Sequence, residues 1–237
     1  MAVYDRYATR RRVKGGVAIR KRQNRLIFEL GLAHNTHGAQ RILEIGPGDG
    51  YVASMSASAG HRYVAVEGSV AVAERLRQRG FGVHAGYVPP LPSAVNGPFT
   101  CCFALHVVEH LPNPQAASQL MHEVHARLAP GGTFVIACPD YLRWGSRFFD
   151  CDYTHSYPMS RRRLDQLLVD HGFEVVHHTI YTGPIFGYAG LPLSWLAKLL
   201  YPRLLDDLIG RAVRGDLLNR GLLAFLPNLL TVARPRG

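Results

Sequence analysis

Short apolar runs alternate with amphipathic stretches between residues 41 and 139. Runs of this length predict buried strands, and the stretches between them have the spacing of helices with one apolar face. Strands that alternate with helices favour right-handed crossover connections, which place helices on both faces of a parallel sheet. The expected strands are 42–46, 62–67, 82–86, 99–106 and 131–139, and the expected helices are about 50–59, 69–79 and 113–129.

The pattern changes from residue 140 onward. A polar and aromatic stretch precedes a helix expected at about 159–171 and a strand expected at 173–181. Such a long irregular stretch is more typical of a functional lid or binding loop than of a simple connection. The leucine-rich residues 185–227 predict a late insertion of short helices, and the last strand, 229–235, needs a neighbour such as 173–181. The pattern therefore predicts an α/β fold with a doubly wound, mostly parallel seven-stranded sheet.

Residues 1–39 carry many arginines and include the apolar piece 26–32, which predicts a basic arm followed by a helix. The arm is either a solvated basic face or an anion-binding segment. Over the whole chain 27 Lys and Arg outnumber 17 Asp and Glu, and the net charge of +10 suggests an anionic partner such as nucleic acid, phospholipid or a phosphorylated substrate. A hydrophobic content of 47% suffices for the core of one domain, expected at 40–237.

The cysteines and the apolar segments indicate the cellular compartment in which the protein is expected. The four cysteines have no CxxC spacing, so free thiols in a reducing compartment are expected. The basic N-terminus lacks the apolar segment of a secretory signal. The most apolar region, 185–201, is interrupted by Pro192 and Lys198 and is unsuited to span a membrane, although it could lie on one. The sequence predicts a cytoplasmic protein, with peripheral membrane contact as an alternative.

The first strand ends in three glycines, at positions 46, 48 and 50. Backbone without side chains at the start of a helix lets a ligand approach closely. The spacing differs from the G-x-G-x-x-G fingerprint of dinucleotide sites, and Glu44 stands two residues before the first glycine. A carboxylate there would oppose a pyrophosphate and suits a cationic ligand. A second acid, Glu67, ends the next strand.

These residues resemble the first motif, E/D-x-G-x-G-x-G, of class I S-adenosylmethionine-dependent methyltransferases, in particular the ubiquinone-biosynthesis (type 11) and type 23 groups. The resemblance covers about residues 40–182 and the last strand, and includes LAPGG at 128–132. It implies a Rossmann-like methyltransferase fold with S-adenosylmethionine as cofactor. The glycines would lie against its methionine part, Glu44 would hold its amino group, and Glu67 would accept from both ribose hydroxyls. The implied cofactor-binding residues are Glu44, Gly46, Gly48, Gly50, Glu67, Leu105 and His106.

One position departs from the family pattern. Many relatives carry an acid shortly after the third strand that accepts from the adenine amino group, whereas this chain has HAGYVPPLP there. Adenine would instead rest on Tyr87 or on apolar residues and bond to the backbone.

The loop after the fourth strand should border the transferable methyl group, because ligands gather at the carboxyl ends of the strands in a doubly wound sheet. A hydroxyl acceptor needs a base to take its proton, and histidine suits this role near neutral pH. His110 is the first candidate and His155, in the lid, the second, with Glu109 in the same catalytic set. Either histidine could instead brace its loop.

A divalent metal is an alternative use of the same loop. Ubiquinone-biosynthesis O-methyltransferases and small-RNA 2′-O-methyltransferases carry the similar string E-x-x-E-H and use it to bind metal. Here His106 replaces the first glutamate, which shifts the ligand set toward imidazole. The candidate ligands are His106, Glu109, His110 and His155.

The resemblance implies that the N-terminal segment, the lid and the late insertion bind the methyl acceptor. The lid aromatics suit a ring, a sugar face or a lipid, or they pack the insertion. The expected function is methyl transfer to a hydroxyl of a small molecule, glycan or lipid-linked biosynthetic intermediate. An RNA methyltransferase is disfavoured, because the Asn/Asp-Pro-Pro-aromatic string of base N-methylating enzymes is missing, and a non-enzymatic binding protein is the other alternative. The lid aromatics are Trp144, Phe148, Phe149, Tyr153 and Tyr157.

Overall fold

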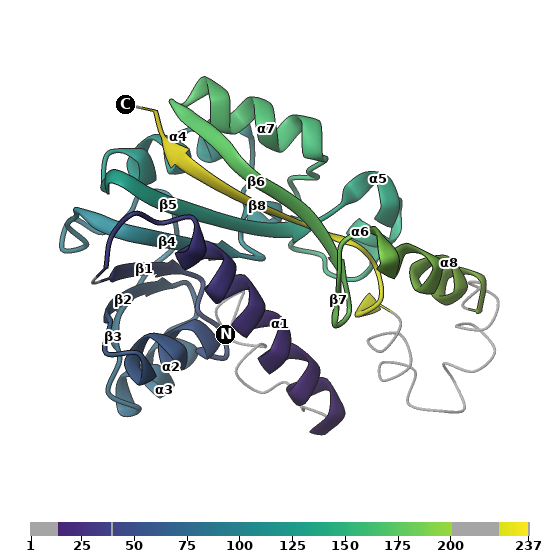
Figure 1. Cartoon of the computed structure of the whole chain (residues 1–237), viewed down its shortest axis with the longest axis horizontal. Helices are drawn as coiled ribbons and strands as arrows, with labels where there is room; N and C mark the ends of the chain where they lie inside the picture. The colour runs from purple at the N-terminus through teal and green to yellow at the C-terminus, as the bar shows by residue number, and fades with distance from the viewer. Residues whose placement is uncertain (1–13, 39, 201–222, 237) are drawn as a thin grey trace.

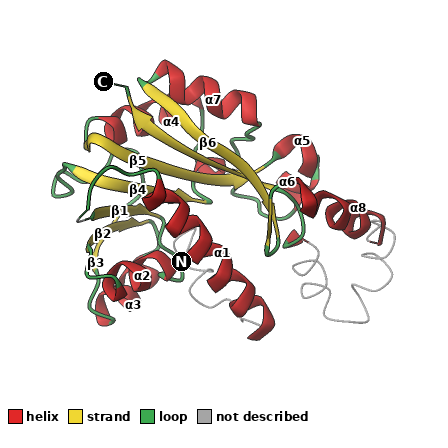
Figure 2. Ribbon diagram, viewed as in Figure 1, coloured by secondary structure: helices red, strands yellow, loops and turns green. Residues whose placement is uncertain are grey.

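The computed structural model describes residues 14–38, 40–200 and 223–236. Within these ranges the strands form one sheet in the order β3-β2-β1-β4-β5-β8-β6-β7 (Figure 2). Strands β1 to β5 are parallel, whereas β8 runs antiparallel to both of its neighbours. The strands are β1 Arg41–Ile45, β2 Arg62–Glu67, β3 Gly82–Ala85, β4 Phe99–Leu105, β5 Leu128–Pro139, β6 Phe173–Thr182, β7 Ile185–Phe186 and β8 Asn228–Pro235.

Helices cover both faces of the sheet (Figure 1). The side chains of Ser69, Asn113 and Ser160 each accept a hydrogen bond from a backbone N–H in the first turn of the helix that follows, which sets where α3, α4 and α7 begin. The helices are α1 Lys14–Ala33, α2 Tyr51–Ser58, α3 Val70–Gln78, α4 Pro114–His125, α5 Tyr141–Trp144, α6 Arg147–Asp150, α7 Arg161–Asp170 and α8 Leu191–Leu200, with 3₁₀ turns η2 Val108–His110 and η3 Tyr188–Gly190.

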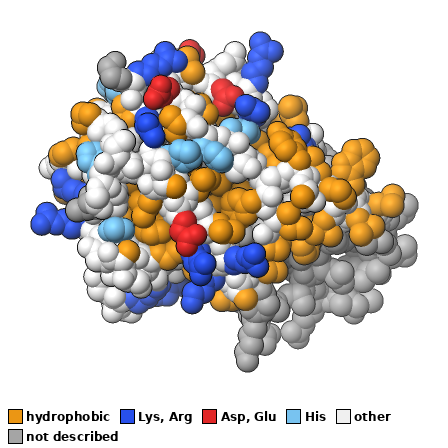
Figure 3. All heavy atoms as spheres, viewed as in Figure 1, with side chains coloured by type: hydrophobic (Ala, Val, Ile, Leu, Met, Phe, Trp, Pro, Cys, Tyr) orange, Lys and Arg blue, Asp and Glu red, His pale blue; other side chains and the backbone are white. Residues whose placement is uncertain are grey.

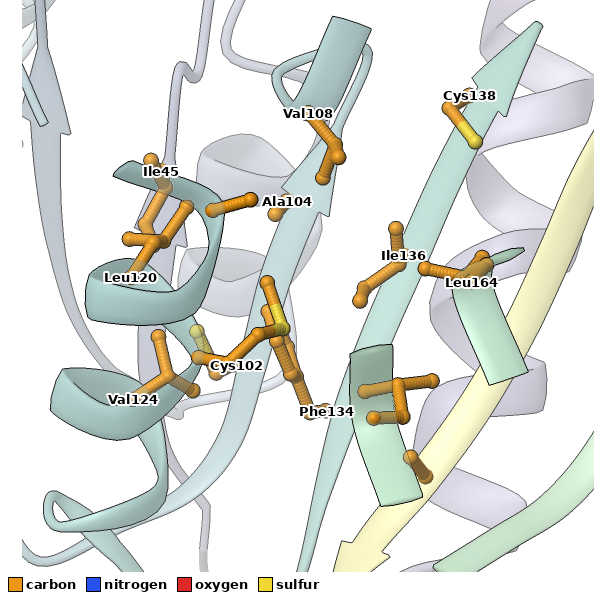
Figure 4. Packing of buried hydrophobic residues seen from close by; sticks show 14 of the residues in the cluster. Ile45, Cys102, Ala104, Val108, Leu120, Val124, Phe134, Ile136, Cys138 and Leu164 are labelled. Carbon is orange, nitrogen blue, oxygen red and sulfur yellow. The ribbon is translucent and has the colours of Figure 1, made fainter. Parts of the chain in front are cut away.

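The two largest of the buried clusters lie on opposite faces of the sheet. Neighbouring residues of a strand point to opposite faces, so Cys101 packs in the cluster with α1 and α2 while Cys102 packs in the cluster with α4 and α7. Figure 4 shows Cys102 and Phe134 of the central strands close to Val124 of α4. All four cysteines are free. The doubly wound α/β fold expected from the pattern is confirmed.

The structure differs from the expectation in the number of strands and in the end of one helix, and it describes only part of the expected insertion. The sheet has one strand more than seven, because the chain reverses at Gly183, with φ of 55°, and the short β7 pairs with the end of β6. The helix expected at about 113–129 ends at His125, because Leu128 pairs with Phe99 and begins β5 earlier than position 131. Of the insertion expected at 185–227, the structure describes β7, η3 and α8, and residues 201–222 lie outside the described residues.

The structure describes only part of the basic arm and helix expected at residues 1–39. Helix α1 carries the basic residues Arg20, Lys21, Arg22 and Arg25 on exposed positions and then packs Ile27 and its neighbours into the core. Residues 1–13 of the expected arm lie outside the described residues. Among the helices that the structure describes, none is long and apolar enough to cross a membrane.

Candidate cofactor and catalytic site

The three glycines form a tight loop between β1 and α2. Gly46, Gly48 and Gly50 have φ of 69°, 49° and 71°, a region that glycine adopts without strain. A Cβ at Gly46 would lie 2.8 Å from Val107 Cγ2, and a Cβ at Gly50 would lie 2.6 Å from Leu76 Cδ2. A Cβ at Gly48 would meet no atom closer than 4.0 Å. The two outer glycines are therefore required by packing, whereas the middle one presents bare backbone to open space.

Glu67 ties this loop to the end of β2. Its Oε2 accepts a hydrogen bond from the Gly48 N–H at 3.1 Å and its Oε1 accepts from the Ser69 N–H at 2.9 Å. Burial raises the pKa of Glu67, while these backbone hydrogen bonds and the charge of Arg75 oppose the rise. The Gly68 N–H also bonds to this carboxylate, so of its four acceptor positions one remains for a ligand hydroxyl.

Glu44 is buried on β1, two residues before the glycine loop, and accepts a hydrogen bond from the Tyr63 hydroxyl. Burial raises the pKa of Glu44 to about 8, and the charge of Glu67 adds to the rise, although the Tyr63 hydrogen bond opposes it. A nearby cation would favour the ionised form. The site is thus rich in acceptors, and these acceptors match an ammonium group and a diol rather than a pyrophosphate.

The end of β4 lies beside the glycine loop. Ile45 pairs with Ala104, so Leu105 and His106 follow β4 next to Gly46. His106 has φ of 59° and is the only non-glycine residue with a positive φ in the part of the chain that the structure describes. Such strained positions are concentrated at functional sites.

His106 is held at both ring nitrogens. Its Nδ1 lies 3.0 Å from Glu109 Oε1, and its Nε2 lies 2.8 Å from the Tyr181 hydroxyl. Tyr181, on β6, was not predicted as a site residue, and it is buried against Phe186. Nothing in the sequence sets this tyrosine apart, because the contact depends on how β6 crosses the sheet.

Glu109 lies between His106 and the pair of His110 and His155. Burial raises the pKa of Glu109, but the hydrogen bond from His106 and the charges of His106 and His110 outweigh it, so the pKa lies below its ordinary value. The Oε2 atom is buried and has no hydrogen-bond partner among the described residues. The rings of His110 and His155 are 4.8 Å apart. The structure therefore brings the three predicted catalytic residues together, and their catalytic roles stay a prediction.

Three of the four predicted metal ligands are close enough to share an ion. Glu109, His110 and His155 each offer a ligand atom, and these atoms lie within 4.8 Å of one another. His106 contacts the same carboxylate but does not belong to this group. The metal hypothesis stays a prediction. Metal analysis of protein purified without a histidine tag tests it, and full activity in a chelator would remove it.

The lid, the irregular stretch between β5 and α7, is bonded to the η2 turn that contains Glu109. The N–H groups of Ser156 and Tyr157 both donate to the carbonyl of Glu109, at 2.9 and 3.0 Å. Of the five lid aromatics, three are buried and pack the fold, whereas Phe149 and Tyr153 are exposed. The buried ones are Trp144, Phe148 and Tyr157.

Two shallow cavities of about 520 Å³ each flank this edge of the sheet. One is lined by Tyr87, Pro89, His110 and Gln119, among others, and so joins the position suggested for adenine to the predicted catalytic loop. The other lies along α7 and contains none of the predicted site residues.

Comparisons with known proteins agree with this geometry. The sequence matches a family of type 23, described as a methyltransferase domain, over residues 7–178. No curated protein matches the chain. Many solved structures share the fold. A putative methyltransferase of Haloferax volcanii, solved in complex with the activator Trm112, has a TM-score of 0.65 at 16% identity, and the match covers 100% of this chain and 99% of the other.

Two further structures show how widely this fold is used. A putative sarcosine dimethylglycine methyltransferase of Galdieria sulphuraria has a TM-score of 0.64 at 14% identity, covering 91% of this chain and 86% of the other. The [4+2]-cyclase SpnF has a TM-score of 0.60 at 18% identity, covering 92% and 81%. At these identities the likeness shows the fold alone.

Proposed function

The chain belongs to the type 23 methyltransferase domain family, and from this premise we propose that it methylates a hydroxyl group of a small molecule, glycan or lipid-linked biosynthetic intermediate. S-adenosylmethionine is the cofactor, and when bound it supplies a methyl group on a positively charged sulfur. We assign the glycine loop to its methionine part, Glu44 to its ammonium group and Glu67 to its ribose. The open backbone at Gly48 and the Glu67 carboxylate, which is bonded to this loop at the end of β2, support this assignment.

We propose a hydroxyl acceptor because of the histidines around Glu109. Transfer to a neutral hydroxyl requires that its proton be removed, and imidazole is an effective base near neutral pH. His106, His110 and His155 cluster about one buried carboxylate, beside the glycine loop. Most of the remaining rate should come from holding the acceptor in line with the methyl group.

The acceptor is expected at the end of the molecule formed by α5, α6 and α8. Figure 3 shows hydrophobic side chains gathered over the end where these helices lie in Figure 1. Exposed side chains there include Leu142 on α5, Phe149 on α6 and Trp195 on α8. An apolar surface of this kind supports an apolar or lipid-linked acceptor, and it also supports peripheral contact with a membrane.

The test has two steps. Thermal shift with S-adenosylmethionine and S-adenosylhomocysteine should stabilise the protein, because both carry the groups assigned to Glu44 and Glu67. Tritiated methyl groups from S-adenosylmethionine should then enter a small-molecule or lipid fraction of a cell extract. The linkage in the labelled product, ether or amine, decides whether the acceptor atom is oxygen.

The exposed basic residues of α1 support a second candidate, transfer to RNA. Binding to phosphates would weaken steeply as salt concentration rises. Label in an RNA fraction, together with such a salt dependence, would favour this candidate over the small-molecule acceptor.

A further inference from the structure

The histidines around Glu109 differ in what they contact. His106 directly follows β4 beside the glycine loop, and its side chain is 45% exposed. His110 lies beyond Glu109, where its Nδ1 contacts the Thr154 hydroxyl and its ring packs on His155. We propose that His106, rather than His110, is the catalytic base, and that Glu109 and Tyr181 position it. This inference rests on the proposed methyl transfer to a hydroxyl.

The contacts of His106 determine where its proton lies. An ionised carboxylate can only accept hydrogen bonds, so the Glu109 contact requires a proton on Nδ1. The lone pair of the neutral imidazole then lies on Nε2, and the Tyr181 hydroxyl donates to it.

The same arrangement suits proton removal. An acceptor hydroxyl that replaces Tyr181 at Nε2 gives its proton to that nitrogen. Its oxygen electron pair forms the bond to the methyl carbon, and the carbon–sulfur bond breaks with its electrons left on sulfur. The imidazolium that results lies against the Glu109 carboxylate, which stabilises the new charge. Charge is conserved, because the positive charge moves from sulfur to the imidazole.

Two further groups near this centre, Cys138 and His155, are poorly placed for the role. Cys138 of β5 faces Glu109 and Tyr181, and burial raises the pKa of its thiol well above the ordinary value, so it stays protonated. His155 Nδ1 contacts the Phe148 carbonyl at 2.7 Å and its ring packs on Phe148. The Cys138 thiol is thus held in the buried sheet, and the His155 ring is held by the lid.

The left-handed backbone at His106 supports a functional placement. A non-glycine residue at φ of 59° costs on the order of 1 kcal/mol, which a structure retains only where its surroundings impose it. Here the backbone N–H of His106 donates to the Ala137 carbonyl at 2.8 Å, while both ring nitrogens are engaged. The imidazole is therefore fixed in orientation before any acceptor arrives.

The first experiment reads the proton position directly. Imidazole ¹⁵N spectra of the full chain, assigned with His106→Gln, should show His106 protonated on Nδ1 and unprotonated on Nε2. Glu109→Gln should reduce this form several-fold, because the ionised acceptor is lost, whereas the exposed control Glu74→Gln should leave it unchanged. A wild-type spectrum with the proton on Nε2 overturns the proposal.

The second experiment tests whether His106 faces the ligand. Diethyl pyrocarbonate acylates the lone-pair nitrogen of neutral imidazoles, and peptide mapping gives the rate at each histidine. S-adenosylhomocysteine should slow acylation of His106 at least threefold and leave the exposed His122 unaffected. If thermal shift shows binding but His106 is not protected, the base assignment fails while the cofactor assignment stands. If no binding occurs, the proposed function fails, whatever the proton position.

Discussion

The two ends of the site are built in different ways. At the glycine loop, backbone geometry and buried acids determine the structure, because two of the three glycines have no space for a side chain and both glutamates are buried. At α5 to α8, large side chains stand in solvent, with Leu142 76% and Trp195 75% exposed. We therefore expect the first end to select one ligand chemistry and the second to accommodate a range of acceptors.

The largest effect is expected when the proposed base, His106, is replaced. His106→Gln should lower the rate of methyl transfer by about 10²–10⁴-fold, because proton removal from the acceptor is lost. Binding of S-adenosylhomocysteine should weaken far less than the rate falls, although His106 also borders the expected cofactor position. The matched control is His122→Gln, on an exposed face of α4. Equal rates for the two variants would contradict the assigned base.

Glu44→Gln should change the free energy of unfolding and the affinity for the cofactor in opposite directions. Burial raises the pKa of Glu44 to about 8 in the folded protein, so the folded state holds a proton that the unfolded state releases above pH 4.5. The wild type should lose stability relative to Glu44→Gln as pH rises from about 4.5 to 8, by on the order of 5 kcal/mol, and the difference should then stay constant.

Urea unfolding at pH 5 and pH 8.5 measures this difference, with the exposed Glu74→Gln as control. The same Glu44→Gln variant should bind S-adenosylhomocysteine more weakly, because a neutral amide replaces the carboxylate assigned to the ammonium group. A variant that is neither stabilised at high pH nor weakened in binding would contradict the account of Glu44.

Gly48→Ala tests, with the addition of one methyl group, whether the cofactor lies against Gly48. The added Cβ has open space in the free protein, so it should fold, but it would occupy the surface assigned to the cofactor. We expect S-adenosylhomocysteine affinity to fall roughly tenfold, or about 1.4 kcal/mol. Gly60→Ala is the matched control, because Gly60 also has a positive φ of 71° and open space. Calorimetry that finds both variants equal would remove the assigned role of Gly48.

The smallest expected effect is at the acceptor end. Trp195→Ser should reduce binding to vesicles of phosphatidylcholine and phosphatidylglycerol about threefold, because an exposed indole contributes to partitioning at a membrane surface. Val70→Ser, exposed at the start of α3, is the control. Vesicle sedimentation that does not distinguish the two variants would contradict membrane contact through α8.

The sequence predicted the cofactor end better than the acceptor end for a physical reason. Strand and helix periods, caps and glycine turns are local, so the strand before Gly46, the glycine loop and the position of Glu67 at the end of the next strand could be read from the pattern. The contact between His106 and Tyr181 joins residues 75 positions apart and depends on how β6 packs. The lid aromatics had equal packing and binding interpretations, and the structure shows that Trp144 and Phe148 are packed.

The central claim is that the loop from Gly46 to Gly50 and its two glutamates hold S-adenosylmethionine. Titration calorimetry of the wild-type chain with S-adenosylhomocysteine and, separately, with NAD tests it most directly. The account predicts one molecule of S-adenosylhomocysteine bound per chain and no heat from NAD. Binding of NAD, or no binding of S-adenosylhomocysteine, would contradict it.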